Sequence, residues 1–202
     1  MEEIIATPLK PLTLYRTDYT TNLHARAMAK ILNVSHMTLL PHLKRLEQHK
    51  ILKCTKSGRN KNYSLNQSNI LTKYYLTSTE DLVTIEFLEK NQLMRKLAEH
   101  LNSLDTSNPI ILFGSYANGT AIDESDIDLF TIGTPTKPQH SHIKKFEATF
   151  GKKINVKTAT TENFNTALRT GDILIKEIVR NHIILRNADP YVTMLWRYHA
   201  QR

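Results

Sequence analysis

The chain has 202 residues, of which 40% are hydrophobic, so it can form one large domain or two small ones and fill their cores. Its net charge of +8 is uneven, because residues 1–70 hold 11 Lys and Arg against 4 Asp and Glu, whereas residues 71–202 hold 16 against 15. No apolar run approaches the roughly 18 residues of a membrane span, no signal-peptide core follows the acidic start, and the single Cys54 excludes an internal disulfide. We therefore expect a cytoplasmic protein with no membrane partner. The basic first third predicts a polyanionic partner for that part alone, and a merely soluble basic surface is the alternative.

Two helices joined by a short break are predicted in the basic third. Residues 24–32 have the apolar spacing of a helix, and residues 33–34 interrupt it. Ser35 can cap a second helix over residues 36–49. Pro41 removes one helical hydrogen bond and clashes with the preceding turn, so we expect a kink there or a later start of this helix. Three leucines line one face of the second helix: Leu39, Leu43 and Leu46.

A basic β-hairpin is predicted directly after the second helix. Residues 51–54 and 62–65 are predicted strands, and the basic segment 56–61, with its Gly and Asn, suits the turn between them. This order of elements (HARAMAKILNVSHMTLLPHLKRLEQHKIL, then GRNKNYSLN) resembles the winged helix-turn-helix of prokaryotic, archaeal-type transcription regulators, over roughly residues 12–66.

The resemblance implies binding to double-stranded DNA, with the second helix in the major groove and the hairpin on backbone phosphates. The expected DNA-contacting residues are His36, Thr38, His42, Lys44 and Arg45 on the helix, and Lys56, Arg59 and Lys61 on the hairpin. Such modules often pair on palindromic sites, so a homodimer is expected. A winged helix used for protein docking or dimerisation is the alternative.

A helical connector is predicted between this module and the next. Residues 69–104 have helical spacing, and Ser78 or Thr79 can cap a helix with acidic residues in its first turn. An apolar stripe along it suits a core or a dimer seam: Leu82, Ile85, Leu88, Leu97, Leu101 and Leu104. We therefore expect a winged helix-turn-helix over residues 1–68, a connector over 69–104, a second domain over 105–190 and a C-terminal tail over 191–202.

A pair of acidic side chains marks the second domain. A buried-type strand over residues 110–113 leads directly into Gly114-Ser115, and a second strand follows over residues 126–130. Residues two apart on a strand face the same side, so Asp126 and Asp128 project together. Two adjacent carboxylates repel each other, and a hard divalent cation such as Mg²⁺ or Mn²⁺ relieves the repulsion.

The segment LFGSYANGTAIDESDIDLF, residues 112–130, resembles the DNA polymerase beta superfamily of nucleotidyltransferases, and the layout is most similar to its minimal members. The resemblance implies an α+β chain whose second domain is a small α/β nucleotidyltransferase with a mixed sheet. In that family, Asp126 and Asp128 would be the catalytic metal ligands, and Gly114 and Ser115 would hold the triphosphate of an NTP. An acidic hairpin with a tight turn is the alternative.

The sequence departs from the family at its third carboxylate. Asn155 occupies the corresponding position, and an amide cannot accept a proton at neutral pH. Lys157 faces the same side two residues later, where it could hold a phosphate. Three readings follow. The domain transfers a nucleoside monophosphate with help from Glu124, Glu162 or the substrate; or it acts slowly on an easily ionised acceptor; or it only senses nucleotide for the DNA-binding module. An antitoxin that modifies a partner toxin protein is a narrower possibility.

Overall fold

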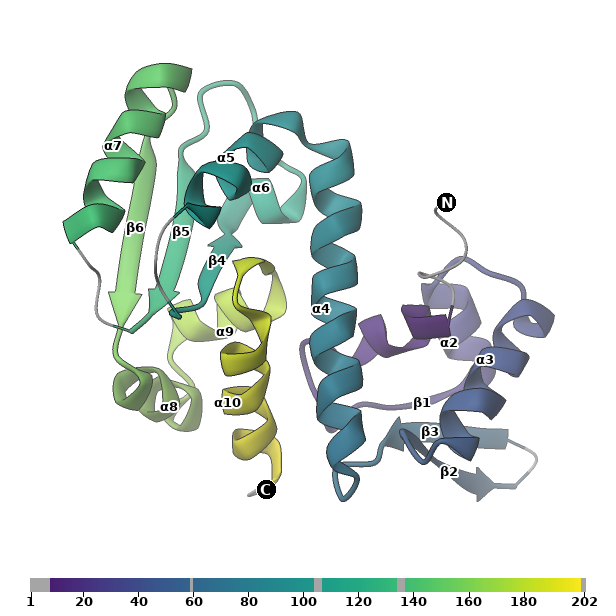
Figure 1. Cartoon of the computed structure of the whole chain (residues 1–202). Helices are drawn as coiled ribbons and strands as arrows, with labels where there is room; N and C mark the ends of the chain where they lie inside the picture. The colour runs from purple at the N-terminus through teal and green to yellow at the C-terminus, as the bar shows by residue number, and fades with distance from the viewer. Residues whose placement is uncertain (1–7, 59, 104–106, 134–136, 201–202) are drawn as a thin grey trace. The chain divides into compact units, whose positions relative to one another are not determined.

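The computed structural model describes residues 8–58, 60–103, 107–133 and 137–200, and the chain divides into two compact units. The first unit comprises Met1–Leu82 with Leu195–Arg202, and the second comprises Val83–Met194. Both boundaries fall inside helices, α4 (Ile70–Lys90) and α10 (Ala188–Ala200), which Figure 1 labels. Residues 191–200 of the expected C-terminal tail belong to α10 and are helical. Tyr191, Val192 and Leu195 of this helix are buried.

The first unit contains the predicted pair of helices and the hairpin in the predicted order (Figure 1). A short 3₁₀ helix and strand β1 precede them, and β1 adds a third antiparallel strand to the hairpin in the order β1-β3-β2. The elements are η1 (Lys10–Tyr15), β1 (Asn22–His24), α2 (Ala25–Ile31), α3 (His36–Gln48), β2 (Leu52–Ser57) and β3 (Asn60–Leu65).

The turn between α2 and α3 is fixed by backbone conformation and by a cap. Asn33 has φ 52°, a left-handed conformation that ends α2 and that Asn tolerates better than most residues. Ser35 caps α3 as predicted, since its Oγ accepts a hydrogen bond from the Thr38 N–H at 3.0 Å. Of the two outcomes expected at Pro41, a kink or a later start, the later start is wrong, because α3 already begins at His36. Pro41 deprives the Met37 carbonyl of its helical donor, and Met37 is 74% exposed, so water can replace that donor.

The hairpin is tighter than its sequence suggested. Lys56 pairs directly with Lys61 in the β2–β3 ladder, so both lie on strands rather than in a six-residue turn. The ladder extends to the pair of Ser57 with Asn60. Gly58, directly after Ser57, has φ 58°, a left-handed conformation that glycine adopts readily. Arg59 lies outside the described residues.

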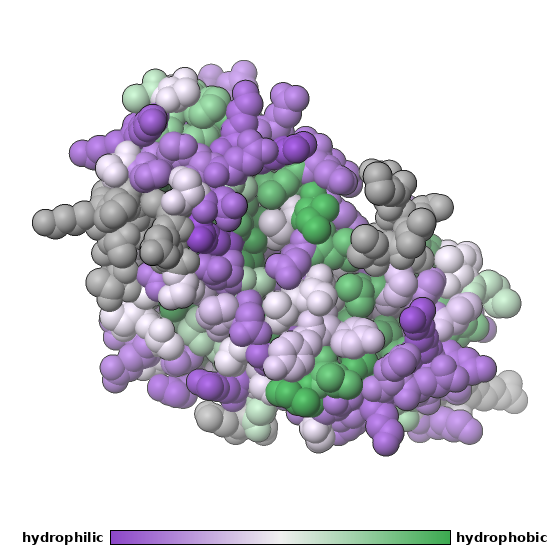
Figure 2. Space-filling model, in the orientation of Figure 1, coloured by the Kyte–Doolittle hydropathy of each residue, from purple (hydrophilic) through white to green (hydrophobic). Residues whose placement is uncertain are grey.

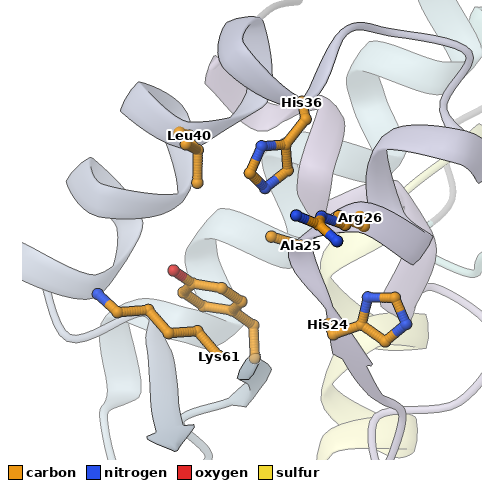
Figure 3. Close-up of a pocket in the computed structure, with 7 residues that line it drawn as sticks. His24, Ala25, Arg26, His36, Leu40 and Lys61 are labelled. Carbon is orange, nitrogen blue, oxygen red and sulfur yellow. The ribbon is translucent and has the colours of Figure 1, made fainter. Parts of the chain in front are cut away.

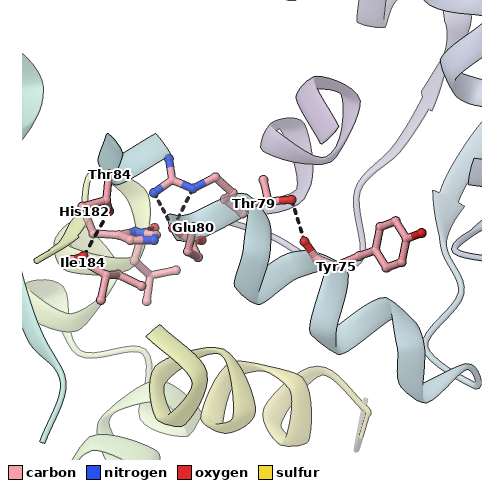
Figure 4. A network of polar contacts seen from close by, with 8 residues as sticks. Tyr75, Thr79, Glu80, Thr84, His182 and Ile184 are labelled. Atoms are coloured by element: carbon pink, nitrogen blue, oxygen red, sulfur yellow. Dashed lines mark hydrogen bonds and ion pairs between the residues drawn. The ribbon is translucent and has the colours of Figure 1, made fainter. Parts of the chain in front are cut away.

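Helix α4 runs without a break through the position where a cap was expected. Thr79 is buried and its hydroxyl donates to the Tyr75 carbonyl at 2.7 Å, which satisfies it within the helix, so neither Ser78 nor Thr79 begins a helix (Figure 4). In the same unit Arg16 donates from two guanidinium nitrogens to Glu80 Oε2, at 2.8 and 2.6 Å. Glu80 is 2% exposed, so this ion pair is buried.

The second unit contains a mixed sheet, as predicted, and the sheet has four strands. Figure 1 shows it. The strand order is β6-β5-β4-β7, in which β5 and β6 are parallel and the other pairs are antiparallel. Its elements besides the ends of α4 and α10 are α5 (Gln92–Asn102), β4 (Ile110–Phe113), α6 (Gly114–Asn118), β5 (Ile127–Ile132), α7 (Lys137–Phe150), β6 (Ile154–Ala159), α8 (Thr161–Thr170), α9 (Ile173–Arg180) and β7 (Ile183–Arg186).

Alternate residues of β5 face opposite sides of this sheet. Ile127 and Leu129 belong to a buried cluster with residues of α5 and α7. On the other side, Phe130 contacts Phe164 of α8, with ring centroids 6.1 Å apart. Asp128 shares the side of Phe130, because residues two apart on a strand point the same way. The core therefore fixes which face of the sheet carries the acidic pair.

No helix among the described residues is long and apolar enough to cross a membrane. Hydrophilic side chains cover much of the face drawn in Figure 2, and apolar side chains interrupt them in patches. Ile85, one of the residues of the expected apolar stripe, is 55% exposed, whereas Leu82, Leu97 and Leu101 are buried. Leu88 is partly buried, and Leu104 lies outside the described residues. The described part of the stripe therefore lies mostly in the core, which is one of its two predicted roles.

Candidate nucleotide site

Asp126 and Asp128 converge on a single amide group. Asp128 pairs with Asn155 in the parallel β5–β6 ladder, and Asp126 lies one residue before β5 begins. The Asn155 Nδ2 donates to Asp126 Oδ2 and to Asp128 Oδ1, at 3.2 Å in each case. The structure therefore brings the two carboxylates and the residue at the expected third position together in one place.

The Gly114-Ser115 bend lies against the same carboxylates. Phe113, the last residue of β4, pairs with Asp128, so the bend begins at the level of the acidic pair. A Cβ atom on Gly114 would lie 2.7 Å from Asp128 Oδ2, closer than a real Cβ contact allows, and Gly114 has φ 70°. Both the close approach and the backbone conformation require glycine here. Ser115, directly after it, is partly exposed.

Lys153 belongs to the site, although it was not predicted there. Its Nζ lies 3.0 Å from Asp126 Oδ2. The hydrogen bond from Lys153, and then the one from Asn155, holds the pKa of Asp126 below its usual range. The pair is open to water, at 68% and 37% side-chain exposure, so it contributes charge to the site rather than stability to the fold. The alternation of Lys153, Asn155 and Lys157 along one side of a strand was the signal available in the sequence.

Lys157 lies close to the residue that precedes the bend. Its Nζ is 5.8 Å from the centroid of the Phe113 ring, and the side chain is exposed. A lysine stacked on that ring stays beside the end of β4, where Gly114 begins the bend. The structure thus places a cation on each side of the acidic pair, Lys153 at Asp126 and Lys157 at Phe113.

Within the described residues, no third acidic group joins Asp126 and Asp128. Among the described residues, no three His, Cys, Asp or Glu side chains gather as a metal site would require, so neither Glu124 nor Glu162 completes the pair. Glu147 is committed elsewhere, because its Oε1 accepts a hydrogen bond from the Ile154 N–H at 2.7 Å. Two convergent carboxylates suit one Mg²⁺ or Mn²⁺, which commonly binds one or two protein carboxylates and completes its shell with phosphate oxygens and water. With only these two carboxylates among the described residues, a second cation would have no separate carboxylate ligand.

The family model of the nucleotidyltransferase domain matches residues 94–184. The segment is therefore similar to nucleotidyltransferase domains. It runs from α5 into β7 and includes the glycine bend, both aspartates and Asn155. It starts before residue 105, the predicted beginning of the domain, because α5 packs into the core of the second unit. Comparisons with curated proteins and with solved structures gave no match.

The matched segment lies within the second unit, and the first unit carries the residues predicted to contact DNA. On α3, Thr38, Lys44 and Arg45 are exposed, whereas His36 and His42 are partly buried. The Thr38 hydroxyl is 2.7 Å from Ser35 Oγ and so already serves the helix cap. On the hairpin, Lys56 and Lys61 are exposed and lie opposite each other.

The way α3 faces determines which of the residues predicted to contact DNA lie on its outward side. His36 and His42 flank the buried leucine face on opposite edges, because six residues turn a helix by about 600°. The outward face instead includes Met37, which is 74% exposed, together with Lys44 and Arg45. The sequence did not single out Met37 as a surface residue of α3, because no motif marks an exposed methionine. Its position follows only once the leucines define the inner face.

Proposed function

We propose that the domain binds an NTP with one Mg²⁺ or Mn²⁺ and transfers its nucleoside monophosphate to an acceptor, in the manner of the polymerase beta superfamily. Asp126 and Asp128 would hold the cation. The observation that carries the proposal is the convergence of their carboxylates on Asn155 beside a bend where only glycine fits. An acidic hairpin without a function would not require the backbone of Gly114 to approach Asp128 so closely.

The residues around the pair have complementary tasks. The backbone N–H groups and the hydroxyl of the Gly114-Ser115 bend would donate to phosphate oxygens, and Lys157 would add a positive charge beside them. Asp126 and Asp128 orient the cation. The cation, when bound, neutralises charge on the phosphates during transfer. In the reaction an acceptor oxygen forms a bond to the α-phosphorus, the bond to the leaving oxygen breaks, and pyrophosphate departs.

Asn155 narrows the class of acceptor. A carboxylate in its place could take the acceptor's proton, but an amide cannot. The acceptor's proton then goes to water or to a phosphate oxygen of the substrate, which favours an acceptor oxygen that ionises readily, such as a phosphate oxygen or a tyrosine hydroxyl. Lys153, next to Asp126, would stabilise such an anion as it approaches.

Transfer of label from α-³²P-NTPs to acceptors in a cell extract tests the enzyme. We expect Mg²⁺-dependent labelling that the Asp128→Ala variant loses by a factor of about 100 or more, the size expected when a group that stabilises the transition state is removed. Glu124→Gln is the matched control, because Glu124 is an exposed acid outside the pair and should leave labelling unchanged. Equal labelling by wild type and Asp128→Ala would reject the proposal.

The first unit is proposed to be a winged helix-turn-helix that binds double-stranded DNA. Two observations support it: the exposed basic side chains of α3, and the facing lysines Lys56 and Lys61 on the hairpin. Phosphates of duplex DNA attract such groups regardless of sequence, with an affinity that falls steeply with salt. Electrophoretic mobility shift at 50 and 200 mM salt tests this directly, and no shift at 50 mM would reject it.

A nucleotide sensor is the second candidate, and Asn155 favours it. Loss of the proton acceptor spares nucleotide binding more than catalysis, so the domain could bias DNA binding without turnover. The test is duplex affinity with and without ATP and Mg²⁺, in wild type and in Asp126→Ala. A nucleotide effect that only wild type shows supports the sensor, and identical affinities in all four conditions reject it.

A further inference from the structure

A pocket in the first unit gathers basic side chains that the predicted DNA contacts only partly include. It has a volume of about 260 Å³, and α2, α3 and the β-sheet line it. Figure 3 shows His36, Arg26 and His24 on one side and Leu40 and Lys61 on the other. The lining residues are His24, Ala25, Arg26, His36, Leu40, Lys61 and Tyr63, and no carboxylate is among them.

The polar groups of this pocket are available to a ligand. Across the described part of the chain, the side chains of Arg26, His36 and Lys61 make no hydrogen bond and no ion pair. His24 Nδ1 accepts a hydrogen bond from the Ala27 N–H at 3.1 Å, so in the neutral ring the proton lies on Nε2, which can donate. Arg26 and Lys61, with no carboxylate among the lining residues, give the pocket a positive potential.

We infer that this pocket binds a phosphate group, through Arg26, His36 and Lys61. The guanidinium fork of Arg26 can bond two phosphate oxygens at once, and Lys61 adds a point charge from the opposite side. The volume lies below the roughly 300–1,000 Å³ of pockets that enclose drug-sized ligands, so it suits a phosphate group better than a whole nucleotide.

Two sources could supply this phosphate: the backbone of a duplex or a free phosphate monoester. Binding of a DNA backbone phosphate in the pocket rests on the proposed DNA binding of the first unit. Binding of a free phosphate monoester does not. Phosphate in the pocket would bridge α2, α3 and β3, so it would also fix the hairpin against the helices.

Calorimetric titration of the full-length protein with inorganic phosphate, at low salt and without divalent cations, tests the pocket. We expect binding that Arg26→Gln weakens about tenfold and Lys61→Gln weakens similarly. Lys30→Gln is the matched control, because Lys30 is an exposed basic residue of α2 outside the pocket. Circular dichroism confirms that each variant is folded. No phosphate binding, or equal weakening by Arg26→Gln and Lys30→Gln, overturns the inference.

Competition with a fluorescent duplex then separates the two sources. If phosphate displaces the duplex and Arg26→Gln weakens duplex binding, the pocket holds a backbone phosphate. If phosphate binds in an Arg26-dependent way while no duplex binds, the pocket stands, its ligand is a free phosphate ester and the DNA-binding proposal fails. Duplex binding that is equal in wild type and Arg26→Gln, without phosphate binding, leaves DNA binding standing and refutes the pocket.

Discussion

The two units build their candidate sites from opposite charges and by opposite means. In the second unit, Asp126 and Asp128 are held by hydrogen bonds from Asn155, on a strand whose other face lies in the core. In the first unit, Arg26, His36 and Lys61 stand around a pocket without side-chain partners within the described residues. A site held by its own hydrogen bonds is organised before a ligand arrives, whereas a cluster of like charges is organised only by the anion that it binds.

The largest expected effect concerns the stability of the first unit. Arg16→Met takes the guanidinium away from the Glu80 carboxylate, which is 2% exposed, and so breaks a buried ion pair. We expect a loss of about 3–5 kcal/mol in the free energy of unfolding measured with urea. Arg95→Met is the control, because its pair with Glu99 is 64% exposed on both sides, and its loss should stay below about 1 kcal/mol. Equal losses would show that burial does not separate the two pairs.

The next effect concerns the organisation of the acidic pair. Gly114→Ala places a Cβ against Asp128 Oδ2, whereas a Cβ on Gly119, at nearly the same φ, meets no atom within 4 Å. Both variants carry the backbone strain of about 1–2 kcal/mol. Only Gly114→Ala should weaken Mg²⁺-dependent NTP binding, by about tenfold or more, as measured by calorimetry. If Gly119→Ala weakens NTP binding as much, strain rather than close approach explains the glycine.

A smaller effect is expected on the outward face of α3. Lys44→Ala and Arg45→Ala should each weaken duplex binding several-fold and reduce the slope of log affinity against log salt by about 1, as the loss of one phosphate contact does. Lys90→Ala, an exposed lysine of the second unit, should change neither quantity. An unchanged salt slope in both α3 variants would remove this face from the DNA contact.

The smallest effect is a shift in the pKa of Asp126. Lys153→Met removes the hydrogen bond that lowers this pKa most, so the Asp126 carboxyl should titrate closer to the ordinary value of about 3.9. The wild-type carboxylate therefore stays ionised further into acid than the variant's does, and carboxyl NMR titration measures the difference. Lys152→Met is the control, because Lys152 donates to the Asp123 carbonyl instead. An unmoved Asp126 titration in Lys153→Met would exclude this ion pair from the site.

The sequence predicted the second site better than the first, for a physical reason. The period of a strand predicts that Asp126 and Asp128 face the same side, and an apolar strand before a glycine is a strong local signal. The parallel register of β5 and β6 then brings Asn155 beside Asp128. The facing of α3 depends instead on tertiary packing, so Met37 and the inward lean of His36 could not be predicted. Arg26 lies on α2, His36 on α3 and Lys61 on β3, and only the fold brings these three together. Likewise, Thr79 was predicted as a possible helix cap, because the sequence does not show that its hydroxyl donates a hydrogen bond to the Tyr75 carbonyl.

Binding of NTP with and without Mg²⁺, to wild type and to Asp126→Ala, tests the nucleotide site most directly, because it needs no knowledge of the acceptor. If Asp126 and Asp128 hold the cation, NTP binding measured by calorimetry requires Mg²⁺ in wild type and is lost in Asp126→Ala. Binding of equal strength in both proteins, or binding indifferent to Mg²⁺, would contradict it.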